Sequence, residues 1–319
     1  MRRHFLLAIT VTCCVSVFGQ NTIGDRMDSA NALIQQGHYA EAIAALTPTE
    51  QFNTAADLER GKAETLAGLA YSGIGQLRKA EQLYEKALVT LGRDDRESLD
   101  YANALSLLGR LRINAGDPDS GERMLRKAAQ IEDHLQDHAG LATVYLHLVA
   151  GAIGQKHWKA ARKYLNAANT EALLAGPNAE PLSAAVDGTT GWLDSVTGHN
   201  AEAVSAFRDA LEIYRTLYGT QHQLTGWAYL LVGRSSAANG DVTTALAYMR
   251  TGLAILKSTI GARDLLYLDG ELAYAKVLEK AGMHPEAEQV HTEASQSLAS
   301  LYHPECLTCT VSVWSLQNP

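Results

Sequence analysis

The stretch that decides the fold is residues 191–210, which read GWLDSVTGHNAEAVSAFRDA. At its centre is Gly198, and a small residue, Gly191, stands seven positions before it. A second small residue, Ala203, follows at the fifth position, and the bulky Phe207 follows at the ninth. Glycine readily adopts the left-handed backbone that ends a helix. The pattern therefore predicts two amphipathic helices joined by a short turn at this glycine.

The same pattern recurs along the chain at spacings of 38, 41, 38, 44, 42 and 42 residues. The turn glycines are Gly37, Gly75, Gly116, Gly154, Gly198, Gly240 and Gly282. In the fourth segment, Ala160 and Tyr164 match the pattern after a one-residue insertion, and His147 takes the upstream position where the other segments have a small residue. A single helix pair cannot bury its apolar face, so successive pairs must stack to form a core. We therefore expect an all-α solenoid.

These repeated residues resemble the tetratricopeptide repeat (TPR). The spacing near 42 residues is similar to the variant found in kinesin light chains, whose linkers often carry a Leu-Gly-x-x-His-Pro stretch. Residues 217–222 (LYGTQH) and 301–304 (LYHP) are similar to that stretch. The resemblance implies a right-handed α-solenoid of about seven helix-turn-helix repeats over residues 27–302, followed by a capping helix within residues 303–319.

The N-terminus has the features of a secretory signal peptide. Arg2 and Arg3 precede an apolar stretch of 14 residues, and small or tolerated residues at 17 and 19 predict cleavage before Gln20. Such a stretch spans only about 21 Å as a helix, less than the ~30 Å hydrocarbon core of a bilayer. We expect a signal peptide at residues 1–19, a linker at 20–26, and a mature protein in the bacterial periplasm or outside the cell. The alternatives are an uncleaved anchor and a lipoprotein modified at Cys13 or Cys14.

Composition and charge restrict the function. The formal net charge is −8, and removal of residues 1–19 leaves 25 basic against 35 acidic residues, or −10. A nucleic-acid binder usually shows a basic face, so this class is disfavoured. The chain has no phosphate loop, nucleophile elbow, dinucleotide motif or zinc-protease motif. We therefore expect a scaffold that carries out no catalysis, holds no cofactor or catalytic metal, and has no membrane span after signal cleavage.

The resemblance also implies where a partner would bind. In tetratricopeptide solenoids the first helix of each repeat lines the concave face, and positions 13, 10, 6 and 3 before the turn glycine contact ligands. Arginine and tryptophan are enriched in binding hot spots, and cations suit the carboxylates of a bound protein segment. The alternative is that the tryptophans pack between repeats. The candidate groove residues, including one neighbour from the irregular fourth repeat, are Asn103, Arg110, Tyr145, Trp192, Trp227, Arg234 and Lys276.

The C-terminal stretch His303-Pro-Glu-Cys-Leu-Thr-Cys309 raises a second possibility for function. Cys306 and Cys309 would lie on one face of the capping helix, either as small packed residues or as a local disulfide. A redox site and a metal site with His303 are the alternatives. However, no βαβ context surrounds the cysteines, and three ligands do not complete a tetrahedral shell. An envelope protein that uses these cysteines is therefore the alternative to a binding scaffold.

Overall fold

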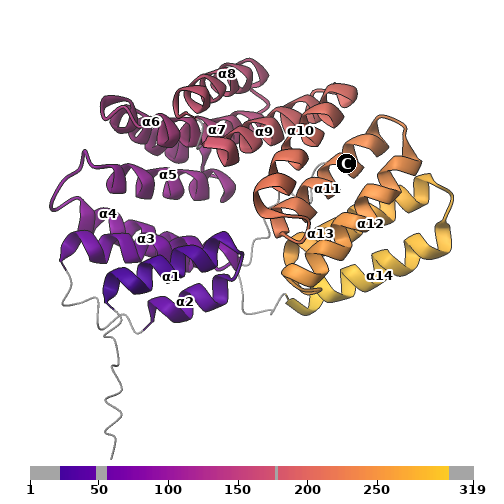
Figure 1. Ribbon diagram of the computed structural model, residues 1–319, viewed down its shortest axis with the longest axis horizontal. Helices are drawn as coiled ribbons and strands as arrows, with labels where there is room; N and C mark the ends of the chain where they lie inside the picture. The colour runs from indigo at the N-terminus through magenta and orange to yellow at the C-terminus, as the bar shows by residue number, and fades with distance from the viewer. Residues whose placement is uncertain (1–21, 48–55, 177–178, 302–319) are drawn as a thin grey trace, which may run out of the picture.

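The computed structural model describes residues 22–47, 56–176 and 179–301, and these ranges contain α-helices and no strand. The helices form seven pairs, which we number repeats one to seven in chain order (Figure 1). The first helices are α1 (Ile23–Gln35), α3 (Asp57–Gly73), α5 (Leu99–Asn114), α7 (His138–Gly154), α9 (Glu180–Val196), α11 (Gln223–Ala238) and α13 (Leu265–Lys280). The second helices are α2 (Tyr39–Leu46), α4 (Leu77–Leu91), α6 (Pro118–His134), α8 (Trp158–Leu174), α10 (Asn200–Tyr218), α12 (Val242–Thr259) and α14 (His284–Leu301). The α-solenoid is confirmed.

The solenoid begins earlier than the sequence predicts. Helix α1 starts at Ile23, inside the predicted linker 20–26. The reason is a capping box: the Asp25 N–H donates to Thr22 Oγ1 at 3.1 Å, and the Thr22 N–H donates to the Asp25 carboxylate at 2.9 Å. The predicted signal peptide, residues 1–19, and the predicted capping segment, residues 303–319, lie outside the described residues.

One backbone turn joins the two helices of every repeat. In repeat one, Gly37 has a φ of 80°, its N–H donates to the Ile34 carbonyl, and the His38 N–H donates to the Leu33 carbonyl. This pair of hydrogen bonds is the Schellman motif, which satisfies the last carbonyls of the first helix. We call the left-handed residue the turn residue. The turn residues of repeats one to seven are Gly37, Gly75, Gly116, Lys156, Gly198, Gly240 and Gly282.

In the fourth repeat the turn residue lies two positions later than the sequence analysis predicts. Gly154 is the last residue of α7, and Lys156, with a φ of 58°, takes the left-handed position instead. The matching small residue is therefore the fully buried Ala161 rather than Ala160, and the matching bulky residue is Leu165 rather than Tyr164. Val149, not His147, occupies the upstream position of close packing, where it is fully buried.

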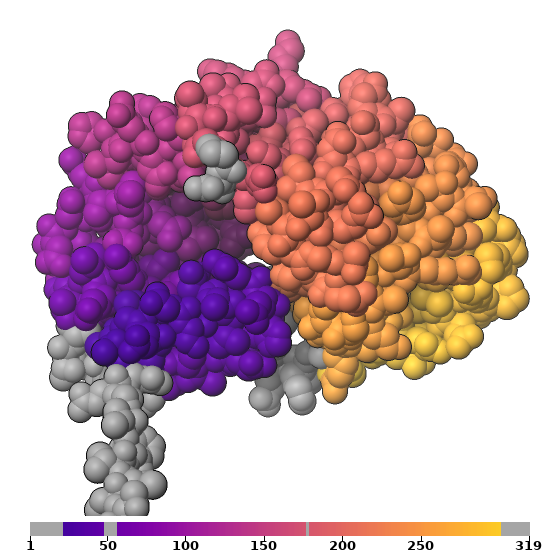
Figure 2. All heavy atoms as spheres, viewed as in Figure 1, coloured from indigo at the N-terminus to yellow at the C-terminus, as the bar shows by residue number. Residues whose placement is uncertain are grey.

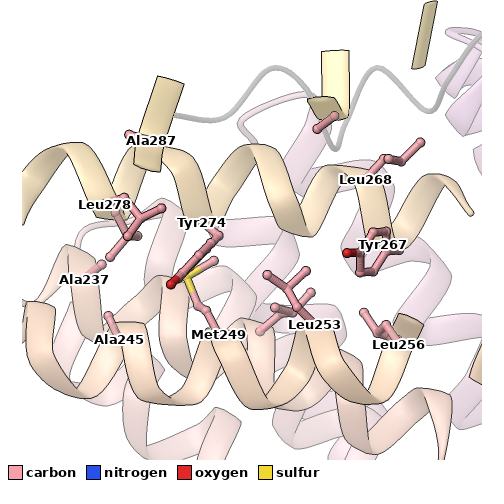
Figure 3. Packing of buried hydrophobic residues seen from close by; sticks show 13 residues of the cluster. Ala237, Ala245, Met249, Leu253, Leu256, Tyr267, Leu268, Tyr274, Leu278 and Ala287 are labelled. Atoms are coloured by element: carbon pink, nitrogen blue, oxygen red, sulfur yellow. The ribbon is translucent and has the colours of Figure 1, made fainter. Parts of the chain in front are cut away.

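Small residues let the two helices of a repeat approach closely. In repeat three, a Cβ atom on Gly109 would lie 2.9 Å from the carbonyl oxygen of Gly121, so the two backbones are almost in contact. The bulky residue nine positions after the turn then fills the space beside this contact; Tyr84, Leu125 and Met249 are completely buried there. Figure 3 shows how Met249 and Leu253 of α12 converge with side chains of α13, so that adjacent repeats share one core.

The curvature follows from how the layers pack. Consecutive first helices pack directly on one another at α1–α3, α3–α5, α5–α7, α7–α9 and α11–α13, whereas no consecutive second helices of the described chain pack as closely. The first helices therefore form the inner, concave layer and the second helices the outer layer. Figure 1 shows the resulting path, which curves until the indigo first repeat lies beside the orange helices of the later repeats.

The close contact in repeat five gives a test with an internal control. A Cβ atom on Gly191 would lie 2.8 Å from the Phe207 ring, whereas one on Gly188, nearly a turn earlier in α9, would meet no heavy atom within 4 Å. We expect Gly191→Ala to lower the free energy of unfolding by about 1–3 kcal/mol through overpacking. Gly188→Ala should raise it by up to about 1 kcal/mol through helix propensity. Urea unfolding followed by circular dichroism measures both, and equal effects would contradict the packing described.

The left-handed lysine gives a second test. A side chain in this conformation costs roughly 1–2 kcal/mol, so Lys156→Gly should raise the free energy of unfolding by about 1 kcal/mol. Lys156→Ala is the matched control, because it removes the lysine side chain but keeps the Cβ atom, and it should leave stability unchanged. If Lys156→Gly is not the more stable of the two variants in urea unfolding, the left-handed assignment at this position is wrong.

Candidate binding groove

Two positions in each first helix face the same side of the inner layer. They lie six and thirteen residues before the turn residue, and their separation of seven residues is close to two helical turns. We call them groove positions six and thirteen. Six of the predicted groove residues occupy them: Arg110, Trp192, Arg234 and Lys276 are at position six, and Asn103 and Trp227 are at position thirteen.

An ion pair shows how these positions meet between repeats. Arg234, at position six of repeat six, lies 3.2 Å from the carboxylate of Asp269, at position thirteen of repeat seven. Burial raises the pKa of Asp269, while the charges of Arg234 and Lys276 oppose that rise. Position six of one repeat thus faces position thirteen of the next. The sequence reasoning missed Asp269, although its place thirteen residues before Gly282 would have identified it.

The same register applies to the two tryptophans. Trp192 is at position six of repeat five and Trp227 is at position thirteen of repeat six, which are the positions that Arg234 and Asp269 hold one repeat later. Both side chains are partly exposed, and Trp192 also packs against the cores on either side of it. Helices α9 and α11, which carry them, do not pack as closely as the other consecutive first helices. The tryptophans therefore mark a widened seam in the inner layer.

Arg110 differs from Arg234 because no carboxylate of the described residues forms an ion pair with it. It is partly buried in α5, close to the Tyr84 hydroxyl and to His147. Burial raises the pKa of Tyr84 to about 12, and the neighbouring charge of Arg110 opposes that rise. Burial, together with the Arg110 charge, lowers the pKa of His147 to about 3, so this histidine is neutral beside the cation. The His147 Nδ1 is 2.9 Å from the hydroxyl of the buried Ser106.

Tyr145 lies elsewhere. It stacks on Tyr164 of α8 with ring centroids 6.4 Å apart, and the acidic groups that act on it are Glu171 of α8 and Asp133 of α6. Its position eleven residues before the turn residue is equivalent to that of Tyr229, whose ring lies 5.6 Å from that of Tyr248 of α12 in a tilted arrangement. Tyr145 therefore points toward the second helices, and the prediction that it lines the groove is wrong. The misplaced register in repeat four explains the error.

Two candidates at the groove positions remain, and the cysteine motif is outside the described ranges. Asn103 and Lys276 are exposed. Cys306 and Cys309 lie beyond residue 301, so their disulfide, redox and metal roles stay predictions. Within residues 22–47, 56–176 and 179–301, no group of three or more His, Cys, Asp or Glu side chains is arranged to hold a metal ion. No helix in the same ranges has the length and hydropathy needed to cross a bilayer.

Comparison with known proteins agrees with this geometry. The family model for the tetratricopeptide repeat matches residues 192–224, which run from Trp192 through α10 into the start of α11. Residues 192–224 thus match a tetratricopeptide repeat, and the described helices have the fold of a tetratricopeptide-like solenoid. It is also 27% identical over 164 residues to a clustered mitochondria protein homolog of Brugia malayi, a match that covers 51% of this chain but spans only 11% of that relative.

Solved structures share the tetratricopeptide fold at low identity. A Rap protein in complex with the Competence and Sporulation Factor is 13% identical, with a TM-score of 0.57 and coverage of 88% of this chain and 98% of that one. A signal-transduction ATPase from Pyrococcus horikoshii with a tetratricopeptide-repeat sensor is 14% identical, with a TM-score of 0.59 and coverage of 83% and 40%. These likenesses concern the fold alone.

The partly buried His147 predicts a pH dependence of stability. The unfolded chain binds a proton on His147 near its ordinary value of about 6.5, whereas the folded protein does so only near pH 3. The unfolded state therefore holds more protons between these values, and stability falls as the pH drops through this window. We expect wild type to lose about 2 kcal/mol more than His147→Gln between pH 7.5 and pH 5. Urea unfolding at both pH values tests this.

The exposed His134 provides the control for this experiment. His134→Gln should retain the wild-type pH dependence, whatever its effect on overall stability. A His147→Gln protein whose stability falls with pH as steeply as the wild type would contradict the assignment.

Proposed function

We propose that this tetratricopeptide solenoid is an exported scaffold that holds a segment of another protein against its concave groove, without catalysis. The observation that carries the proposal is Arg110, a partly buried cation that forms no ion pair with a carboxylate of the described residues and lies beside Tyr84 and His147. It is on the same inner layer as Trp192 and Trp227. Among the described residues, the polar partner of Arg110 is the Tyr84 hydroxyl. The Arg110 guanidinium keeps donors for a carboxylate of a partner, and such charge-assisted hydrogen bonds are among the stronger polar contacts.

The chemistry of the groove indicates the kind of segment that it would hold. Arg110 suits an acidic side chain or a C-terminal carboxylate, and the tryptophans at the widened seam suit an apolar or aromatic side chain. Arg234 is already paired with Asp269, so it is the less available cation. A Rap protein of similar fold has been solved in complex with the Competence and Sporulation Factor, which supports a binding role for this kind of solenoid.

The location remains part of the proposal. The charged N-terminus, the short apolar stretch and the small residue at 19 support export to the bacterial periplasm or the extracellular space. Partners would then be found among envelope or secreted proteins.

The test is affinity capture from an envelope extract, followed by calorimetry with the segment of the partner that binds. We expect Trp227→Ala and Arg110→Ala each to weaken binding by about 2 kcal/mol or more, roughly thirtyfold in Kd, as for hot-spot residues. Circular dichroism must show that each variant keeps its helicity.

Trp158→Ala is the matched control, because Trp158 is an exposed tryptophan on the second helix α8. It should bind like the wild type. A partner that is lost with Trp158→Ala and retained by both groove variants would place the binding site on the outer face and refute the groove.

A further inference from the structure

The first repeat makes a long-range contact that the repeat pattern does not predict. A Cβ atom on Gly37, the turn residue of repeat one, would lie 2.2 Å from Oε1 and 2.5 Å from Cδ of Gln223, the first residue of α11. The main chain of Gln35 also acts on the adjacent His222 ring. That ring stacks on Tyr218 at 4.5 Å, and its Nδ1 accepts a hydrogen bond from Leu224, so the linker before α11 is held in place.

The contact is repeated one repeat later. A Cβ atom on Gly75, the turn residue of repeat two, would lie 3.7 Å from Leu265, the first residue of α13. Gln223 and Leu265 are equivalent, since each stands seventeen residues before the turn residue of its repeat. Repeat one therefore meets repeat six, and repeat two meets repeat seven. The superhelix completes a turn in about five repeats, and Figure 2 shows the indigo and orange surfaces touching where it closes.

The other turn glycines have no such neighbour. Cβ atoms on Gly116, Gly198, Gly240 and Gly282 would meet no heavy atom within 4 Å. The two inter-turn contacts are thus specific to the N-terminal repeats, which are the ones that have a repeat five places further along the chain.

The contact that closes the superhelix is small. Helices α1 and α2 pack closely only on each other and on α3, and no helix of the first two repeats packs along a helix of the last three. In the described chain, turns and helix ends meet there, through the Gln223 amide, the His222 ring and the exposed Leu265. A contact of this size opens at far lower cost than the unfolding of a repeat.

We propose that the inter-turn contact of Gly37 with Gln223, supported by Gly75 with Leu265, is a reversible latch that closes the superhelix around its concave groove and limits access to it. The inference rests on the proposed function, because it is the groove whose access changes. A bulky partner reaches Arg110 and the tryptophan seam only when the latch is open, whereas small molecules reach them in either state.

The first experiment locks the latch. In a full-length background with Cys13, Cys14, Cys306 and Cys309 replaced by serine, we introduce Gly37→Cys with Gln223→Cys. A Cβ atom added at Gly37 would lie 2.5 Å from the Gln223 Cδ. Since that Cδ is about 2.5 Å from its own Cβ, the two Cβ atoms are at most about 5 Å apart, near the disulfide range. We expect an intramolecular disulfide on mild oxidation, and none with Gly116→Cys plus Gln223→Cys. Absence of the first cross-link would overturn the closure.

The second experiment opens the latch. Asparagine tolerates the left-handed conformation, so it adds bulk at a turn residue with little strain. Gly37→Asn with Gly75→Asn should increase the radius of gyration in small-angle X-ray scattering. The matched control is Gly116→Asn with Gly240→Asn, whose side chains would enter open space, and it should leave the radius unchanged. An unchanged radius in the first pair would overturn the latch.

Access to the groove is then measured with a thiol at Asn103→Cys and two reagents, N-ethylmaleimide and a maleimide on a long polyethylene glycol chain. We expect the bulky reagent to react about tenfold faster with the opened protein than with the disulfide-locked one, and the small reagent to react equally with both. A thiol at the exposed outer residue Lys163 is the control and should not respond. Equal rates for the bulky reagent at position 103 would overturn the gating.

None of these readouts needs a partner, so failure to capture one would refute the proposed function and leave the latch standing.

Discussion

The whole architecture depends on one left-handed residue at the end of each first helix. It allows two hydrogen bonds to close the helix and reverses the chain within a few residues. The reversal sets the residue seven positions before the turn against the residue five positions after it. Because both are small, the two backbones almost touch, as Gly109 and Gly121 do, and the bulky ninth residue can fill the shared core. The repeat therefore follows from a single backbone conformation and the small residues around it.

This dependence explains which parts of the fold could be predicted. Where glycine marks the left-handed position, the sequence alone identifies the helices, the turn and the buried small residues. It fails in repeat four, because Lys156 adopts that conformation and the nearby Gly154 is an ordinary helical residue. An error of two residues rotates a helical position by about 200°. The correct register therefore places Tyr145 on the side of α7 that packs against the second helices, and not on the side that faces the groove.

The places of the candidate groove residues in the fold were predictable for the same reason, whereas their role in binding stays a prediction. Six of the predicted residues share two positions, because any residue at a fixed offset from the turn faces the same way. The ion pair of Arg234 with Asp269 was not predicted, since it requires knowing that position six of one repeat meets position thirteen of the next. The contact between the first and the later repeats, which closes the superhelix, was even harder to predict from the sequence. It accumulates from a small rotation at every repeat, and no pair of residues in the sequence encodes it.

Closure of the superhelix changes how many repeats the terminal repeat contacts. In an open solenoid each repeat contacts only its neighbours, so a terminal repeat depends on a single interface. Here the terminal repeat also has the shortest of the described helices, since α2 has 8 residues. The contact with Gln223 gives this repeat a second neighbour, repeat six, which also carries Trp227 at groove position thirteen. A ligand that spreads α9 and α11 would move the start of α11 and strain the same contact. The proposed binding at the tryptophan seam and the proposed closure at the first repeat therefore share one helix, α11, through which a segment held in the groove would strain the latch.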